Sequence, residues 1–352
     1  MGLVAILTFQ CSTDKFDTHE SFKTNEVESK SIIKDLNEFF LMNNVSLDNE
    51  MLNFKTVKRM VAFLQKIENS EYKDSDLNLF ENEIGFTSFR RIYAAAIDDL
   101  ENSTSEVEYK SKLIEYSSIV SDKDLSPNIV MLNMLPVLNN EWFIKMEGVI
   151  YKYNEEAVIV AHENTINAVN KVENSRATKS NGFYEFPAII DLRGSCSNTY
   201  SDQETEGDKR ARLKYTATKH TTYHTVTECD YEYVWDPVNE KYEYKLVCRE
   251  VTKPKSVILG VNIDGAAFRK VLWTWHLYST ELDLLVDMEL EPDGITYHIE
   301  YDEHEASAKT IVKNWTTAPD VDLNNPGGFE FNNADLYFKS RGVETAVTHT
   351  CN

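Results

Sequence analysis

Residues 223–254 constrain the fold of this chain more than any other segment, because a single turn fixes how two strands pair. Residues 236–241 read Asp-Pro-Val-Asn-Glu-Lys, which is the composition of a tight turn. If the chain folds back about the middle of this turn, aromatic residues and cysteines meet on one face, since strand side chains alternate between faces. The facing pairs are Trp235 with Tyr242, Tyr233 with Tyr244, Tyr231 with Leu246, and Cys229 with Cys248.

The opposite face of this hairpin selects the same register. Its expected pairs are Glu232 with Lys245, Glu228 with Arg249, and Val226 with Val251. Opposite charges across a pair of strands stabilise by about 0.2–1 kcal/mol, and a slip of one residue would move every side chain to the wrong face. The sequence therefore predicts a hairpin with one aromatic face. The candidate binding residues on that face are Tyr231, Tyr233, Trp235, Tyr242 and Tyr244.

The cysteines, at positions 11, 196, 229, 248 and 351, are odd in number. Facing strand residues have Cβ atoms about 4.5–5.5 Å apart, so a small adjustment allows a disulfide between Cys229 and Cys248. If Cys11 carries a lipid, elimination pairs Cys196 with Cys351. The alternative is a cytosolic protein in which all these cysteines are reduced.

Short antiparallel connections dominate the chain from 183 to 352. The strands expected after the hairpin are 256–263, 270–278, 282–290, 295–301, 336–339 and 343–349. Connections this short exclude a doubly wound parallel sheet. The sequence predicts an α+β fold, in which an N-terminal helical region is followed by a largely antiparallel β-rich domain, built as a sandwich or an open barrel.

Helical periodicity marks the first part of the chain. Apolar residues recur at spacings of three and four in 55–68, 77–84 and 89–100, and a fourth helix is expected through Val107 and Ile114. Each apolar stripe predicts a face turned toward the core. Gly85 is expected at a helix C-terminus, and Ser105 with Glu108 at a capping box. After Pro127, runs at 142–146, 149–153 and 157–161 predict a three-stranded meander.

These patterns divide the chain into four segments. The expected segments are a lipoprotein-type signal segment over 1–11, a polar tether and first helix over 12–50, a helical region with a short β-meander over 51–170, and an antiparallel β domain over 183–352. The polar stretch 162–182 is expected to be a linker. The alternative is that the helices pack on the same sheet as the β-rich part.

The N-terminal segment has the layout of a bacterial lipoprotein signal. Residues 2–9 are apolar, Cys11 follows, and residues 12–20 are polar. In such a signal the cysteine carries the lipid, and the polar segment tethers the folded part to the membrane. We therefore expect lipidation of Cys11 and a location in the cell envelope, anchored at the outer membrane or cell surface. The alternative is an ordinary N-terminal strand with a buried cysteine.

The charge balance excludes two classes of partner. Acidic residues outnumber basic ones 58 to 36, which gives a formal net charge of -22. Such a field repels phosphate backbones, so neither a general nucleic-acid binder nor a polybasic membrane binder is expected. No apolar run reaches the roughly 18 residues of a spanning helix, so contact with a membrane is expected only through the lipid anchor.

Few segments suggest chemistry. His220 and His224 have a spacing that suits zinc on a helix, but their surroundings predict a strand, where four residues span about 13 Å. Asp320, Asp322 and Asn324 are similar to the start of a calcium loop that lacks its glycine and its bidentate glutamate, so we expect an acidic loop there. Residues 302–305 (Asp-Glu-His-Glu) are expected to be a solvated charge run beside a strand. We expect no cofactor, and the sequence has no G-x-S-x-G, P-loop or H-E-x-x-H motif.

Four features of the chain are similar to those of uncharacterised secreted lipoproteins of Bacteroidetes bacteria. They are the apolar start that leads to Cys11, residues 51–55 (Met-Leu-Asn-Phe-Lys), residues 83–88 (Glu-Ile-Gly-Phe-Thr-Ser), and residues 138–142 (Leu-Asn-Asn-Glu-Trp), which run on to Val-Ile-Tyr-Lys at 149–152. The resemblance covers most of the chain. It implies an envelope location and no known activity, so it transfers no functional residue.

Two functions are consistent with these patterns. The first is a surface-anchored binding or structural module of the bacterial cell envelope, which holds a glycan or a protein ligand through exposed aromatic side chains. The second is an envelope hydrolase, acting on a glycan or a peptide, whose acid and base residues are dispersed along the chain. An aromatic, open cleft would favour the first, and a closed cleft lined by carboxylates would favour the second.

Overall fold

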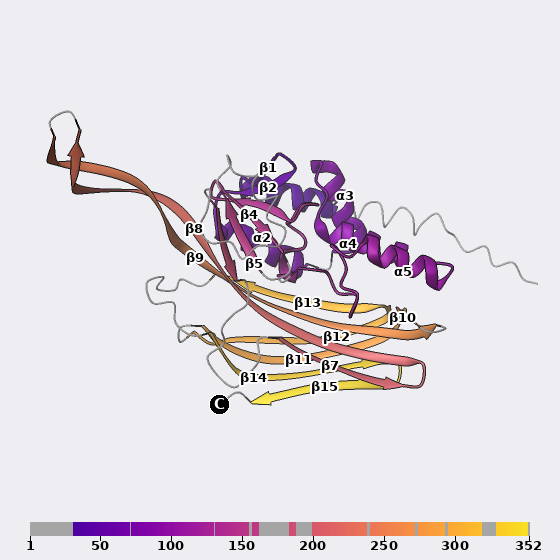
Figure 1. The fold of residues 1–352 in the computed structure, drawn as a ribbon. Helices are drawn as coiled ribbons and strands as arrows, with labels where there is room; N and C mark the ends of the chain where they lie inside the picture. Colours follow the sequence, from indigo (N-terminus) through magenta and orange to yellow (C-terminus); the bar gives the residue numbers. More distant parts are fainter. Residues whose placement is uncertain are drawn as a thin grey trace, which may run out of the picture.

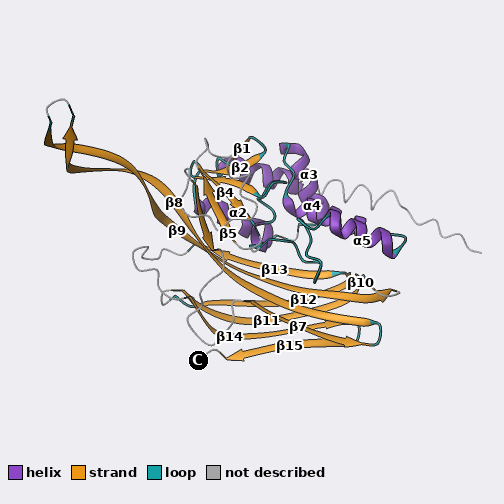
Figure 2. Ribbon diagram, in the orientation of Figure 1, coloured by secondary structure: helices purple, strands orange, loops and turns teal. Residues whose placement is uncertain are grey.

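The protein belongs to the α+β class and is mostly β-structure (Figures 1 and 2). Helices lie in its N-terminal part, and the sheets that the described residues form are not closed into a barrel. The predicted class is confirmed at this level. The computed structural model describes residues 31–70, 72–129, 131–154, 157–161, 183–187, 199–237, 240–271, 274–292, 295–318 and 329–350.

The helices form where the apolar periodicity predicts them. After a helix over 31–42 come α2 (Val57–Glu68), α3 (Asp74–Ile84), α4 (Phe89–Glu101) and α5 (Glu106–Glu115), and a short 3-10 turn spans Leu132–Met134. Gly85 ends α3 with a φ of 71°, a conformation that glycine adopts without strain. The Ser88 side chain caps α4 by accepting a hydrogen bond from the backbone N–H of Arg91.

In α5 the predicted core face is wrong. Ser105 caps the helix by accepting from the Glu108 N–H, but the Glu108 carboxylate accepts from the Thr104 N–H instead of closing the expected capping box. Val107 and Ile114 are 80% and 75% exposed. Tyr109 is the buried residue instead. A helix of ten residues with few apolar side chains offers two faces of similar hydrophobicity, and the larger aromatic side chain gains more from burial.

The first sheet contains the predicted meander and extends it on both sides. Its strands are β1 (Ser46–Asp48), β2 (Met51–Phe54), β3 (Phe143–Met146), β4 (Val149–Tyr153), β5 (Ala157–Ala161) and β6 (Phe183–Pro187), in that order across the sheet. All neighbours are antiparallel except β2 and β3. Because β6 pairs with β5, this sheet continues to Pro187.

Two further sheets pack face to face. One contains β7 (Thr199–Glu206), β8 (Lys209–Asp236), β9 (Lys241–Val271), β10 (Thr274–Leu277) and β13 (Thr310–Thr317). The other contains β11 (Thr280–Pro292), β12 (Tyr297–Ala308), β14 (Phe329–Ser340) and β15 (Val343–Thr350). Inward side chains of both sheets, among them Leu213, Leu284 and Phe338, form one core. As predicted, alternate residues of β11 from Leu282 to Leu290 are buried in it.

Two strand predictions need correction. The strand expected over 270–278 is two strands, because β9 ends at Val271 and β10 turns back to pair Thr274 with that residue. The charge run at 302–305 lies inside β12, which continues to Ala308. There Asp302 and His304 are exposed on the outer face of the sheet, so polar residues extend the strand.

The helical part covers the outer face of the five-stranded sheet (Figure 1). Ala96 and Leu100 of α4 share an apolar cluster with Phe268 of β9 and Leu277 of β10. The Gln65 side chain of α2 donates to the carbonyl of Thr316 at 2.8 Å. The helical part therefore contacts the five-stranded sheet. The division of the chain at 162–182 stays a prediction, and those residues lie outside the described part.

Candidate functional site

The predicted hairpin forms an arm that projects from the body of the protein (Figure 1). Thr222 and Val257 are buried, whereas the described side chains farther out are exposed or half-buried. A β-bulge between Thr222 and Tyr223 marks the base of the arm, where such irregularities increase strand twist. The Lys255 ammonium at this base lies 2.6 Å from the Glu147 carboxylate of the first sheet.

The register of the arm agrees with the prediction at every pair. Trp235 faces Tyr242, Tyr233 faces Tyr244, Tyr231 faces Leu246, Glu232 faces Lys245, Glu228 faces Arg249, and Val226 faces Val251. The agreement follows from the period of two in a strand, because only one register places the rings on one face and the charges on the other.

The aromatic face of the arm, defined by Tyr231, Tyr233, Trp235, Tyr242 and Tyr244, is open to solvent. Its side chains range from 47% exposed for Trp235 to 73% for Tyr233. The rings contact one another across the strands. Tyr231 stacks on Tyr244 with ring centroids 5.3 Å apart, and Trp235 meets Tyr242 edge-on at 5.2 Å. Contiguous exposed apolar surface of this kind marks an interaction site more often than it marks ordinary surface.

The opposite face of the arm carries ion pairs whose partners differ from the expected ones. Arg249 forms a two-pronged pair with Glu232, with both N–O distances 2.5 Å, and Lys253 pairs with Glu228. Arg249 faces Glu228 in the register but contacts Glu232, and Lys253 faces His224 but contacts Glu228. Both basic side chains thus reach a carboxylate four residues farther along the opposite strand. Lys245 pairs with Glu243 on its own strand at 2.8 Å.

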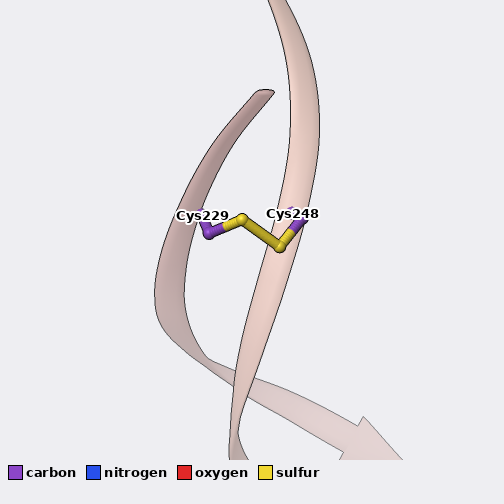
Figure 3. Close-up of a disulfide and its surroundings, with 2 residues drawn as sticks. All are labelled: Cys229 and Cys248. Atoms are coloured by element: carbon purple, nitrogen blue, oxygen red, sulfur yellow. A yellow bond between two sulfur atoms is a disulfide. The ribbon is translucent and has the colours of Figure 1, made fainter. Parts of the chain in front are cut away.

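A disulfide joins the two strands of the arm between Cys229 and Cys248, as predicted (Figure 3). Their Cα atoms are 4.0 Å apart and their side chains lie on the aromatic face, next to the Tyr231–Leu246 pair. An isolated two-stranded ribbon is marginal in water. The cross-link therefore holds the register in the part of the arm that no core supports.

Other predicted site residues lie outside the described part of the chain. They are the lipidation site Cys11, the second cysteine pair Cys196 and Cys351, and the weak calcium candidates Asp320, Asp322 and Asn324. The roles expected for these residues stay predictions from the sequence.

His220 lies in β8, so the predicted strand is confirmed. On a strand, the spacing of His220 and His224 does not suit zinc. Its ring packs edge-on against Tyr151 and Tyr153, with centroids 5.3 and 5.5 Å away. Burial lowers the pKa of His220 to about 3, so the imidazole is neutral at physiological pH. His220 is a core residue that joins β8 to the first sheet. The side chain of His224 lies outside the described part.

An acidic row crosses the outer face of the four-stranded sheet. Glu300 of β12 faces Asp287 of β11, which in turn faces Asp335 of β14. They border an open depression of about 620 Å³, whose floor includes Leu285 and Tyr337. The sequence shows that alternate positions of these three strands carry carboxylates. It does not show which strands are neighbours, so the row itself could not be predicted.

A smaller cleft of about 190 Å³ lies between α2 and β13. Burial raises the pKa of Glu68 at its edge, although the carboxylate accepts a hydrogen bond from the backbone N–H of Asn314 at 2.8 Å. This bond connects the helix to the sheet. Glu68 therefore serves packing between the two layers.

A third cleft was not predicted. It lies between α5, the loop at 121–126 and the strands β7 to β10, and it has a volume of about 230 Å³. The sequence signal for it is the alternation of Arg210, Arg212 and Lys214 with apolar residues along β8. That pattern places three basic side chains on the face of the strand that the helical part covers.

The histidine, cysteine, aspartate and glutamate side chains of the described residues form no group of three or more that could hold a metal ion. In the same part of the chain, no helix is long and apolar enough to cross a membrane.

Comparison with known proteins gives little further information. No family model matches the chain, and no curated protein matches it. Among solved structures, the chain is similar to a DUF4848 family protein from Bacteroides thetaiotaomicron, with 14% identity and a TM-score of 0.28 over 86% of this chain and 98% of that protein. At this level the likeness supports no argument about fold or activity.

Proposed function

We propose that this chain is a binding module of the bacterial cell envelope, and that the aromatic face of the arm is its contact surface. The observation that supports this proposal is a set of five rings, exposed together on a ribbon that projects from the body. Buried in a core, such rings would stabilise the fold; exposed at the end of an arm, they remain available to a ligand.

The layout of the rings favours a glycan as the ligand. Successive ring pairs along the arm are two residues apart, which corresponds to about 7 Å in a strand. A regular row of flat, apolar surfaces matches a ligand that itself repeats, and sugar rings offer apolar C–H faces at regular intervals. The net charge of -22 further favours a neutral polymer over an anionic one.

A protein is the second class of ligand that suits this surface. Tyrosine and tryptophan are enriched in protein-recognition surfaces, because they supply large contact areas at a low cost in side-chain entropy. A direct binding measurement with glycans distinguishes these two classes of ligand.

Affinity electrophoresis of the full chain in gels that contain a neutral mannan, xylan or β-glucan tests the glycan proposal. We expect at least one polymer to retard the chain, and we expect the triple variant Tyr231→Thr/Tyr233→Thr/Tyr244→Thr to lose this retardation. The matched control is Asp230→Thr/Val234→Thr/Lys245→Thr, which changes the opposite face with the same strand-compatible residue. Retardation by none of the polymers, or equal retardation of both variants, would overturn the proposal.

The proposed anchor is a lipid on Cys11, and its support is the sequence pattern of an apolar segment, a cysteine and a polar tether. Mass spectrometry of the protein from its native host tests it, with a lipid-modified N-terminal Cys11 as the expected result. An intact, soluble chain that still begins with unmodified Met1 would contradict it.

The structure gives less support to a hydrolase. Asp287, Glu300 and Asp335 are exposed on an open sheet face, where water reaches the carboxylates freely. A general acid usually sits in a shielded environment that keeps it protonated. We therefore do not propose an activity for the acidic row.

A further inference from the structure

The cleft between α5 and the strands β7 to β10 contains an arginine that has no counter-ion among the described residues. Arg210, Arg212 and Lys214 project from the same face of β8. Asp264 and Asp124 neutralise Arg212, and Asp124 also lies 3.3 Å from the Lys214 ammonium. Within the described chain, no carboxylate lies within ion-pairing distance of the Arg210 guanidinium, and its Nε is buried without a hydrogen-bond partner.

Arg210 is held in place by an aromatic ring. Its guanidinium carbon lies 4.0 Å from the centroid of the Trp275 indole, which is stacking distance. A guanidinium fixed in this way on one face has its N–H edge free to bind a ligand, and little side-chain entropy remains to be lost. Burial also lowers the pKa of Arg210, because desolvation penalises its charge. An anion beside the guanidinium would offset that penalty.

The walls of the cleft limit what such an anion can be. Leu113, Leu125 and Phe268 provide apolar surface, while Lys123 and Asp122 are exposed at the rim. The volume of about 230 Å³ is below the roughly 300–1,000 Å³ of sites for drug-sized ligands. The planar fork of an arginine matches the two oxygens of a carboxylate.

We propose that this cleft is a binding site for a small carboxylate with an apolar body, which pairs with the Arg210 guanidinium and packs against Trp275 and Phe268. This site is distinct from the aromatic face of the arm. It does not depend on the function proposed for the arm.

Fluorine NMR of the full chain with 4-fluorobenzoate tests the proposal, because the ligand resonance broadens on binding. We expect saturable binding of 4-fluorobenzoate, and binding at least about tenfold weaker for the neutral isostere 4-fluorobenzamide, because the amide cannot form the charged pair. Inorganic phosphate, which lacks an apolar body, should not displace the benzoate at equal concentration.

The variants Arg210→Gln and Arg210→Lys assign the interaction to the guanidinium. Arg210→Gln should weaken the binding of 4-fluorobenzoate at least about tenfold, and Arg210→Lys should also weaken it, because an ammonium lacks the planar fork. The matched control is Arg269→Gln, which removes an exposed arginine that pairs with Asp208 on the neighbouring part of the sheet. This control should bind like the wild type.

Among the residues that the structure describes, Arg210 has no ion-pair partner that its removal would leave unpaired, so the variants are expected to fold. Urea unfolding of each variant checks that they do. Four results would overturn the proposal: no saturable binding of benzoate at millimolar concentrations, equal binding of benzoate and benzamide, displacement by phosphate, or an Arg210→Gln variant that binds like the wild type.

Discussion

The imidazole of His220 lies between the rings of Tyr151 and Tyr153, where water does not reach it. In the unfolded chain its pKa is about 6.5, whereas burial lowers it to about 3 in the folded protein. Between these values the unfolded chain binds a proton that the folded protein does not. The contribution of His220 to stability is therefore complete above about pH 6.5 and is lost progressively as the pH falls toward 3.

Replacing His220 with phenylalanine should remove this dependence, because the new ring fills similar space and does not titrate. From roughly pH 6 down to pH 4, the free energy of unfolding should fall less steeply in the variant, by up to about 1.4 kcal/mol per pH unit. Urea unfolding at several pH values measures the slope. The control is His304→Phe: a hydrogen bond with Asp283 raises the pKa of this exposed histidine, so its loss should not reduce the slope. An unchanged slope in His220→Phe would contradict the account.

Gly265 of β9 allows Phe338 of β14 to approach the backbone across the core. A Cβ atom at this glycine would overlap the phenylalanine ring, which is fully buried. Gly265→Ala should therefore lower the free energy of unfolding by about 1–3 kcal/mol. In the double variant with Phe338→Leu, the loss in the free energy of unfolding should be smaller than the sum of the losses in the two single variants, by at least about 0.5 kcal/mol. Strict additivity in urea unfolding would show that the two residues do not meet.

At the scale of elements, the arm was predicted in detail because all the information for its register is local. Ring pairs, charges and cysteines within 32 residues select one register, and the disulfide and the five rings followed from it. Packing partners decided what local pattern could not. In α5, Tyr109 is buried and the predicted Val107 and Ile114 are not. In the first sheet, β2 pairs with β3, which lies about ninety residues later in the chain. Arg210 lines a cleft whose walls come from both α5 and β8.

Removing the disulfide with Cys229→Ser/Cys248→Ser should loosen the arm and leave the body unchanged, because the arm contributes little to the core. By the chain-entropy model a loop of about this length gives at most about 3 kcal/mol, which corresponds to roughly a hundredfold faster amide exchange. Hydrogen exchange in 226–249 should speed up toward this limit. Exchange in β11 should not change. Equal changes in both segments, or none in the arm, would contradict this local role.

At the scale of the whole molecule, the β-rich part is predicted to behave as a compact unit after the polar stretch 162–182. Limited proteolysis should cut first within 12–30 and around 171–182, where the sequence predicts a tether and a linker. The arm should resist early cutting although it is exposed, because its backbone is paired in a ladder that a disulfide closes. Early cutting within 223–301 would contradict the predicted unit.

The aromatic side chains Tyr231, Tyr233, Trp235, Tyr242 and Tyr244 are presented to solvent on an arm that a disulfide cross-links. Hydroxyl-radical footprinting of the full, oxidised chain measures this directly, because side-chain oxidation follows exposure. Rapid oxidation is expected for Tyr231, Tyr233, Trp235, Tyr242 and Tyr244. The buried Tyr151, Tyr153 and Tyr215 serve as internal references and should react slowly. If the rings of the arm react as slowly as these references, the arm is folded against the body or against another chain, and the account is wrong.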